Sequence, residues 1–142
     1  MSKMTVNYCN KNVNPKNHKT GDCTTRALST VLGISWEDAL TLQYQYSLKT
    51  KYDMTSKQVI ERIMADRGYV KMKQPRKEDN TKYLVGEIDK LTYHTERKNG
   101  VLILLANHCT AIIGDDLIDI WDCRWKTIGN YWIKPLSNIR KE

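Results

Sequence analysis

Three polar side chains stand at positions where folded proteins often place reacting groups. Cys23 follows Asp22 at the expected start of a helix. The free N–H groups and partial positive charge of a helix N-terminus favour a thiolate, which is the nucleophilic form of cysteine. His108 begins an expected strand, and an imidazole there can take the thiol proton and return it later. The pattern predicts a thiol nucleophile with a histidine base.

A carboxylate is needed to orient such an imidazole and to stabilise its charged form. Asp119 and Asp122 both lie on the strand expected to return beside His108. A three-residue hairpin loop, 114–116, sets His108 directly opposite Asp122. A two-residue loop instead puts Asp119 on the histidine face, displaced toward the turn. We favour Asp122 because it ends its strand near the start of the histidine strand, although a bulge would reverse this choice.

Helical spacing dominates the first half of the chain, and strand-like runs dominate the second. The pattern predicts helices at 23–32, 35–49, 55–68 and 84–91, and strands at 5–8, 69–72, 101–105, 108–113, 117–122 and 131–134. Helices followed by hairpin-connected strands favour an α+β fold with an antiparallel sheet over an alternating βαβ fold.

The length of 142 residues suits one domain, 1–142. We expect a loop with a short strand over 1–21, a helical part over 22–68 and mainly sheet over 69–142. Hydrophobic residues make up 40% and charged residues 27%, as in ordinary globular proteins. The longest apolar run is too short to cross a bilayer, and the first residues lack the apolar stretch of a signal peptide. We therefore expect a cytoplasmic protein with no membrane partner.

The charge and the cysteines exclude several classes of site. The formal net charge is +7, which permits a nucleic-acid partner, but the basic residues are dispersed and form no block of five like charges. The four cysteines form no Cys-x-x-Cys pair, so the usual zinc and redox motifs are missing. Without a secretory signal, disulfides are not expected. We expect free thiols, no metal and no cofactor.

The order Cys23, His108, Asp122 resembles that of the papain-like cysteine peptidases. The motifs that carry this resemblance are GDC at 21–23, NHC at 107–109 and DIWD at 119–122. The likeness in layout covers residues 14–134. The compact size and the stretch NPKNHKTGDCTTRAL are most similar to small phage-encoded and bacteriocin-leader-processing members of the family. The resemblance implies a papain-like fold, in which a helical half with the nucleophile helix packs on an antiparallel sheet.

The resemblance also implies an activity, that of a cysteine peptidase or related thiol hydrolase. Cys23 would attack an amide or isopeptide carbonyl of a peptide or protein substrate and form a thioester, which deamidases and acyl transferases also use. Papain-like enzymes usually place a glutamine of the oxyanion hole six residues before the cysteine. Asn17 occupies that position here, and Asn14 is a second candidate.

A second interpretation is a catalytically idle papain-like protein of phage or mobile-element origin, which binds or inhibits a host protein or nucleic acid. Its support is the positive charge together with an aromatic cluster near the C-terminus. That cluster mixes Trp121, Trp125, Tyr131 and Trp132 with Arg124 and Lys126. The sequence does not determine the oligomeric state.

Overall fold

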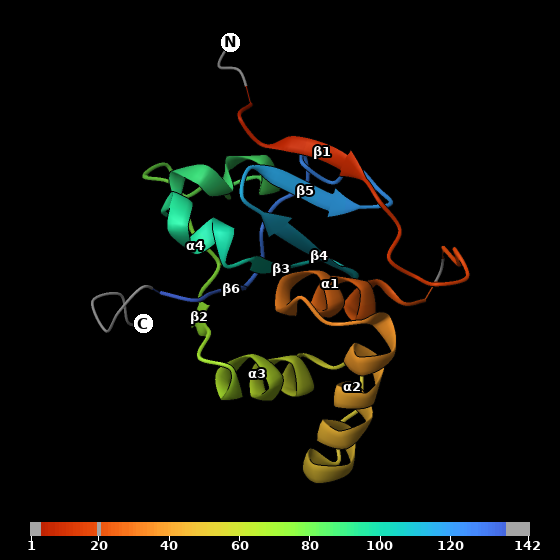
Figure 1. Ribbon diagram of the computed structural model, residues 1–142. Coiled ribbons are helices and arrows are strands. Elements are labelled where there is room, and N and C mark those ends of the chain that lie inside the picture. Colours follow the sequence, from red (N-terminus) through yellow and green to blue (C-terminus); the bar gives the residue numbers. More distant parts are fainter. Residues whose placement is uncertain (1–3, 20, 136–142) are drawn as a thin grey trace.

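The computed structural model describes residues 4–19 and 21–135 and has a mixed α+β architecture (Figure 1). The elements, in chain order, are β1 (Asn7–Asn10), α1 (Cys23–Leu32), α2 (Trp36–Thr50), α3 (Lys57–Asp66), β2 (Val70–Met72), the 3-10 helix η1 (Val85–Lys90), α4 (His94–Lys98), β3 (Val101–Leu105), β4 (His108–Ile113), β5 (Asp116–Asp119) and β6 (Tyr131–Ile133). The three longest helices precede most of the strands, which confirms the predicted α+β class.

Local signals define the helix ends. Gly33 ends α1 in the left-handed conformation, with φ of 66°, which glycine adopts without steric cost. The Ser35 side chain accepts a hydrogen bond from the Asp38 N–H at the start of α2, as expected of an N-cap. Ser56 caps α3 in the same way, so that helix begins later than the predicted residue 55.

The sheet has six strands in the order β1-β5-β4-β3-β6-β2. All neighbours are antiparallel except β1 and β5, which pair in parallel from Asn7 with Asp116 to Asn10 with Asp119. The prediction of a purely antiparallel sheet is therefore wrong at this edge. A parallel pair needs a long connection rather than a hairpin, and no local pattern indicated that the N-terminal segment adds to the β5 edge.

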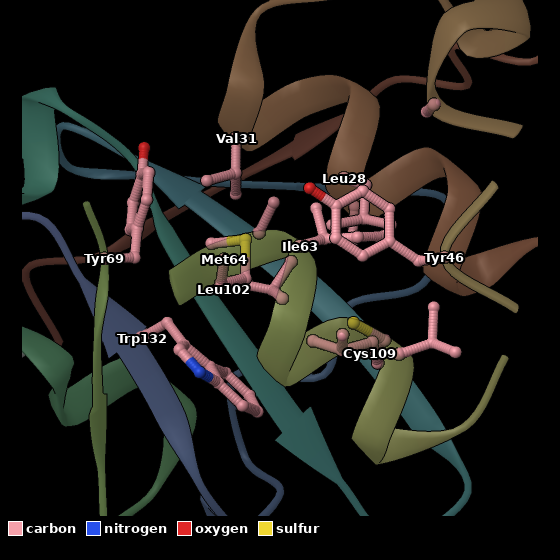
Figure 2. Packing of buried hydrophobic residues seen from close by; sticks show 14 residues of the cluster. Leu28, Val31, Tyr46, Ile63, Met64, Tyr69, Leu102, Cys109 and Trp132 are labelled. Atoms are coloured by element: carbon pink, nitrogen blue, oxygen red, sulfur yellow. The ribbon is translucent and has the colours of Figure 1, made fainter. Parts of the chain in front are cut away.

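Helices α1, α2 and α3 lie on one side of the sheet (Figure 1). Their apolar side chains, among them Leu28, Ile63 and Met64, pack against Leu102 and Trp132 of the sheet (Figure 2). This core holds the N-terminus of α1 against the strands. The position of the first residue of α1, Cys23, is therefore set by tertiary packing and not by a flexible loop.

A second apolar cluster covers the opposite face of the sheet. It includes Val101 and Ile103, which alternate with Leu102 along β3, together with Val85 and Ile88 of η1. Alternate residues of a strand point to opposite faces, so β3 is buried on both sides. Among the described residues, no helix has the length and apolarity needed to cross a membrane.

The predicted helix at 84–91 corresponds to η1, but α4 was not predicted. Its sequence, HTERK, has no apolar stripe to indicate a helix. Instead, the buried Arg97 side chain donates to the carbonyl oxygens of Thr92 and Gly114. These contacts within the fold hold the short helix, so residues 69–135 combine sheet with two short helical segments.

Candidate active site

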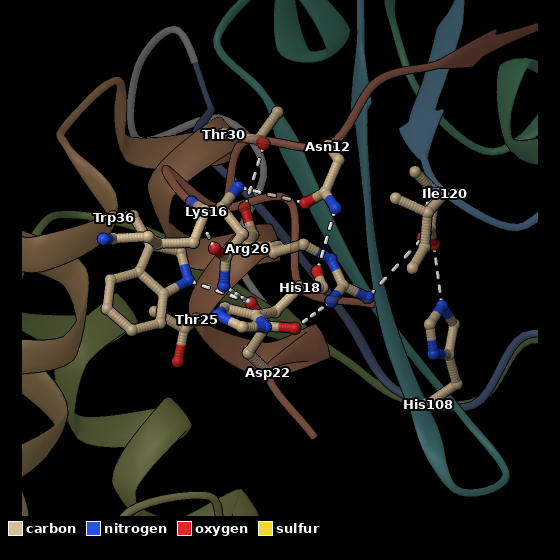
Figure 3. A network of polar contacts seen from close by, with 12 residues as sticks. Asn12, Lys16, His18, Asp22, Thr25, Arg26, Thr30, Trp36, His108 and Ile120 are labelled. Carbon is tan, nitrogen blue, oxygen red and sulfur yellow. Dashed lines mark hydrogen bonds and ion pairs between the residues drawn. The ribbon is translucent and has the colours of Figure 1, made fainter. Parts of the chain in front are cut away.

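Cys23 is half-buried at the first position of α1, where the helix N-terminus is left open. Asp22 occupies the N-cap position, but its side chain makes no capping bond. Its carboxylate instead accepts hydrogen bonds from Asn14, Trp36 and Arg26 (Figure 3). The first N–H groups of α1 are therefore not capped by Asp22 and can interact with an anion.

The surroundings of Cys23 favour its thiolate. A hydrogen bond from His108 is the largest influence and lowers the pKa of the Cys23 thiol. Burial acts in the opposite direction, and the backbone N–H of Cys109 and the side chain of Thr24 also lower the pKa by donating to the sulfur. The net result is a pKa below the ordinary value for cysteine, as in reactive rather than structural thiols.

His108 lies at the start of β4 and contacts Cys23 and Asp119 together. Its Nε2 is 2.7 Å from Oδ2 of Asp119, which leaves Nδ1 as the ring nitrogen for the thiol. Burial disfavours the imidazolium, but hydrogen bonds to Asp119, Cys123 and Cys23 outweigh it and raise the pKa of His108 to about 11. At neutral pH the structure thus favours an imidazolium beside a thiolate.

The carboxylate that meets His108 is Asp119, so the predicted pairing of His108 with Asp122 needs correction. Ile113 pairs with Asp116, and the hairpin loop has two residues, 114 and 115, not three. This register puts Asp119 on the histidine face. Strand β5 also ends at Asp119, earlier than predicted. Asp122 follows in the next turn, where it accepts hydrogen bonds from the Arg124 side chain and backbone.

Asp119 is buried and has several hydrogen-bond donors. Its Oδ2 accepts from His108 and, at 2.6 Å, from the Thr110 hydroxyl, and its Oδ1 accepts from the Ile120 N–H. Burial alone would raise the pKa of Asp119, but these bonds and the positive imidazolium lower it. Asp119 therefore remains ionised, as a group that stabilises an imidazolium must.

Arg26 extends this polar network on the other side of Asp119. It is buried one helical turn after Cys23 and binds the carboxylate of Asp22. Its Nη2 also lies 4.0 Å from Oδ1 of Asp119 (Figure 3). The guanidinium thus lies between two carboxylates, so neither is left as an uncompensated buried charge.

The Trp121 ring shields His108 from one side. The two ring centroids are 4.9 Å apart and the planes meet at 76°, an edge-to-face arrangement. Trp121 itself remains 42% exposed. An aromatic ring in this position restricts the imidazole and limits the access of water to it. The hydrogen bonds of the imidazole are stronger where water is excluded.

Two clefts open to solvent meet at the thiol. Their volumes are about 430 Å³ and about 360 Å³, and each is of the size of a ligand pocket. Both clefts are lined by Cys23, Thr24, Thr55, Asn107 and His108. The larger cleft extends toward Trp121, and the smaller extends toward Leu104 and Leu105. An extended chain that occupied both clefts would pass directly over the sulfur.

The structure brings neither predicted oxyanion residue into these clefts. Asn17 is exposed in a turn with φ of 59° and is not among the described residues that line either cleft. Asn14 is buried, but its amide donates to Asp22 and its oxygen accepts from the Lys16 N–H. The other donors at this end of the site are the uncapped N–H groups at the start of α1, the Cys109 N–H and the Thr24 side chain.

Sequence reasoning missed two side chains that support His108. Thr110 binds Asp119, and its position two residues after His108 on the same strand face could have indicated this contact. Trp121 was considered only as part of an aromatic cluster that could bind a protein or nucleic acid, with no link to His108. Its contact with His108 depends on the turn after β5, which no sequence pattern defined.

One group of potential metal ligands converges among the described residues, namely His108, Asp119 and Cys123, whose donor atoms lie within 4.8 Å of one another. Hydrogen bonding explains their convergence, because Asp119 accepts from His108 and, at 3.9 Å, from the Cys123 thiol. A structural zinc site needs four protein ligands, and no fourth His, Cys, Asp or Glu among the described residues joins this group. We assign no metal to it.

No protein-family model matches the chain, and neither the curated proteins nor the solved structures contain a significant match. The chemistry of the site therefore has to be argued from its own geometry.

Proposed function

We propose that this chain is a papain-like cysteine peptidase or a closely related thiol hydrolase, with Cys23, His108 and Asp119 as its catalytic residues. The single observation that carries the proposal is the imidazole of His108. It lies beside a cysteine at an uncapped helix N-terminus and lowers the pKa of that thiol, while its Nε2 is 2.7 Å from a buried carboxylate. These are the relations between nucleophile, base and orienting group that acyl transfer requires.

The layout of the fold supports the papain-like part of this proposal. The nucleophile begins a helix of the N-terminal helical half, and the histidine and carboxylate follow on adjacent strands of the sheet. Helix α1 packs directly against the sheet (Figure 1). The order Cys23, His108, Asp119 preserves the order of residue types in the papain-like resemblance, with Asp119 replacing Asp122 as the third member.

In the proposed reaction, the Cys23 thiolate attacks the carbonyl carbon of an amide, and a bond forms between sulfur and carbon. The carbonyl oxygen becomes an oxyanion, which the N–H groups at the start of α1 stabilise. When the C–N bond breaks, the His108 imidazolium gives its proton to the departing amine. The product of this half-reaction is a thioester on Cys23 and a neutral imidazole.

Water completes the cycle. Neutral His108 removes a proton from a water molecule, whose oxygen attacks the thioester carbonyl and displaces the Cys23 sulfur. A carboxylic acid leaves, and the thiolate–imidazolium pair is restored. Asp119 remains ionised throughout and stabilises His108 whenever the imidazole is charged.

Formation of the thioester can be tested with p-nitrophenyl acetate, an activated ester that requires no specificity. We expect a burst of nitrophenolate equal to the enzyme concentration and a mass increase of one acetyl group on Cys23. His108→Ala should abolish the burst, and Cys9→Ala, which removes an exposed thiol elsewhere, should leave it intact. Acetylation spread equally over the exposed thiols, or unaffected by His108→Ala, would refute the proposal.

A further inference from the structure

The two clefts that meet at Cys23 differ in chemistry. The larger cleft is lined by Lys19, Arg26 and Trp121, whereas the smaller is lined by Leu104 and Leu105 and has no charged side chain apart from the shared Cys23 and His108. Among the described residues that line either cleft, none is an aspartate or a glutamate. Beyond the residues that both clefts share, a substrate that spans Cys23 therefore meets Lys19 and Trp121 on one side and leucine side chains on the other.

The positive charge of the larger cleft is available to a ligand. Arg26 is already compensated by Asp22 and Asp119, but Lys19 forms no ion pair with a described residue and is exposed. Lys126 also has no ion-pair partner among the described residues, and its Nζ lies 5.8 Å from the centre of the Trp121 ring. Lys19 thus brings an uncompensated ammonium group to the larger cleft, and Lys126 brings a second one to Trp121, a residue of its wall.

Acidic side chains close to cleft residues along the chain do not cancel these charges. Asp122 is bound by Arg124. Asp53 accepts hydrogen bonds from the N–H and the hydroxyl of Thr55, which directs the Asp53 carboxylate to the backbone of its own loop. Asp119 is buried behind His108 and neutralised by it. The exposed surface of the larger cleft therefore attracts a carboxylate.

The smaller cleft suits an aliphatic side chain rather than a carboxylate. Leu104 and Leu105 end β3 half-buried, and the buried Cys109 lies beside them. Cys109 is not an ionised group at neutral pH, because burial raises the pKa of its thiol well above the ordinary value. An aliphatic side chain placed beside Leu104 and Leu105 would be removed from water by apolar neighbours.

We infer that the substrate of the proposed hydrolase is a peptide segment with an aliphatic residue on one side of the scissile bond and a carboxylate on the other. The aliphatic side chain occupies the cleft of Leu104 and Leu105, and the carboxylate lies between Lys19 and Lys126 beside Trp121. This inference rests on the proposed function, because it treats Cys23 as the reacting atom between the two clefts. It adds the substrate class, which the catalytic residues alone do not define.

The inference can be tested with short peptides that carry a chloroacetyl group on a central side chain, so that alkylation of Cys23 measures recognition without turnover. One set has leucine on one side and glutamate, glutamine or lysine on the other, and a second set has the reverse order. Each peptide is made with an amidated and a free C-terminus, which separates a side-chain carboxylate from a terminal one. Mass spectrometry gives the second-order rate at Cys23, divided by the iodoacetamide rate of the same protein.

We expect the glutamate peptide, in one of the two orders, to label Cys23 about tenfold faster than its lysine counterpart, since each exposed charge contact contributes about twofold to fivefold. Replacement of leucine by alanine should lower the rate by about tenfold, from the loss of apolar burial. Lys126→Glu should reverse the charge preference. The matched control is Lys134→Glu, because Lys134 also lies over an aromatic ring, but that ring, Tyr69, lines neither cleft, whereas Trp121 beneath Lys126 lines the larger one.

Equal labelling rates for the glutamate and lysine peptides would overturn the inference. It would also be overturned if Lys126→Glu and Lys134→Glu changed the charge preference equally, because the preference would then reflect only the net charge of the protein. The proposed function fails by a different result: iodoacetamide would then react with Cys23 no faster in the wild type than in His108→Ala. The two failures are thus distinguishable within one set of proteins.

Discussion

Replacing Asp119 by asparagine should slow the reaction of Cys23 at low pH. Asp119 accepts from His108 and Thr110 through Oδ2 and from Ile120 through Oδ1. An asparagine can present its oxygen to only one of these sides. Whichever way the amide is turned, its NH₂ group faces at least one N–H or O–H donor, and the negative charge beside the imidazolium is lost.

The size of this effect follows from the hydrogen bond between His108 and Asp119, whose side chains are only 12% and 4% exposed. A hydrogen bond to a charged group contributes about 1.5–3 kcal/mol. At 1.36 kcal/mol for each pKa unit, its loss corresponds to a change of about one to two in the pKa of the coupled thiol and imidazole. We expect about 10- to 100-fold less thiolate at a pH below the pKa of Cys23, and an equal fall in its alkylation rate.

The assay is the rate of iodoacetamide alkylation of Cys23 at about pH 6, where an ordinary thiol of pKa about 8.5 is almost fully protonated. Asp122→Asn is the matched control. Asp122 binds Arg124 near the surface and does not contact His108, so that variant should react within about twofold of wild type. Thermal unfolding of both variants verifies that they are folded.

If the alkylation rate of Cys23 falls in Asp122→Asn but not in Asp119→Asn, the strand register and the role of Asp119 are refuted. Equal rates in both variants and the wild type would show that no carboxylate supports the imidazole. Either result would leave the close approach of His108 and Asp119 without a chemical role.

Three further results are expected from the same site. Arg26→Met should lower the free energy of unfolding in urea by about 3 kcal/mol, because the buried carboxylates of Asp22 and Asp119 lose their shared cation; a loss below about 1 kcal/mol would contradict this. Trp121→Ala should lower the alkylation rate of Cys23 by about twofold to fivefold through the loss of the contact at 4.9 Å with His108, and should leave the fold stable; an unchanged rate would argue against shielding. In the wild type, the alkylation rate should fall with decreasing pH only below the ordinary thiol pKa, because the pKa of Cys23 is lowered. Toward alkaline pH the rate should stay level until His108 loses its proton at about 11. A rise in the rate centred on the ordinary thiol pKa of about 8.5 would contradict the ion pair.

The sequence predicted the features that depend on local chemistry. The helix that begins at Cys23 and ends at Gly33 follows from capping preferences and apolar spacing, and so does the start of α2 after Ser35. The strand that begins at His108 follows from its place between the turn after the apolar run 101–105 and the hairpin signal at Gly114. These signals were enough to place a cysteine and a histidine at element ends, although they did not show that the two side chains touch.

The features that depend on register or on distant segments were not predictable in the same way. One residue in the length of the β4–β5 loop decides whether Asp119 or Asp122 faces His108, and Gly114 followed by Asp115 and Asp116 is compatible with both. The parallel pairing of β1 with β5 joins segments more than one hundred residues apart. The helix α4 is held by Arg97 contacts rather than by its own sequence pattern.

Asn17 shows that spacing from the cysteine alone is weak evidence for an oxyanion-hole residue. Its spacing before Cys23 matches that of an oxyanion-hole amide, but its left-handed backbone, with φ of 59°, fits a turn. Asparagine is among the few residues that adopt this conformation readily. The residue type is therefore explained by the turn alone, and Asn17→Gly should leave the rate of the nitrophenolate burst from p-nitrophenyl acetate unchanged.

The central claim is that Cys23 and His108 form a thiolate–imidazolium pair, and the most direct measurement is the pH dependence of Cys23 alkylation by iodoacetamide in the wild type and in His108→Ala. We predict that wild-type Cys23 reacts much faster than the other three thiols at about pH 6, and that His108→Ala returns it to the profile of a thiol of pKa about 8.5. If both proteins show that ordinary profile, the pair does not exist and the catalytic interpretation is wrong.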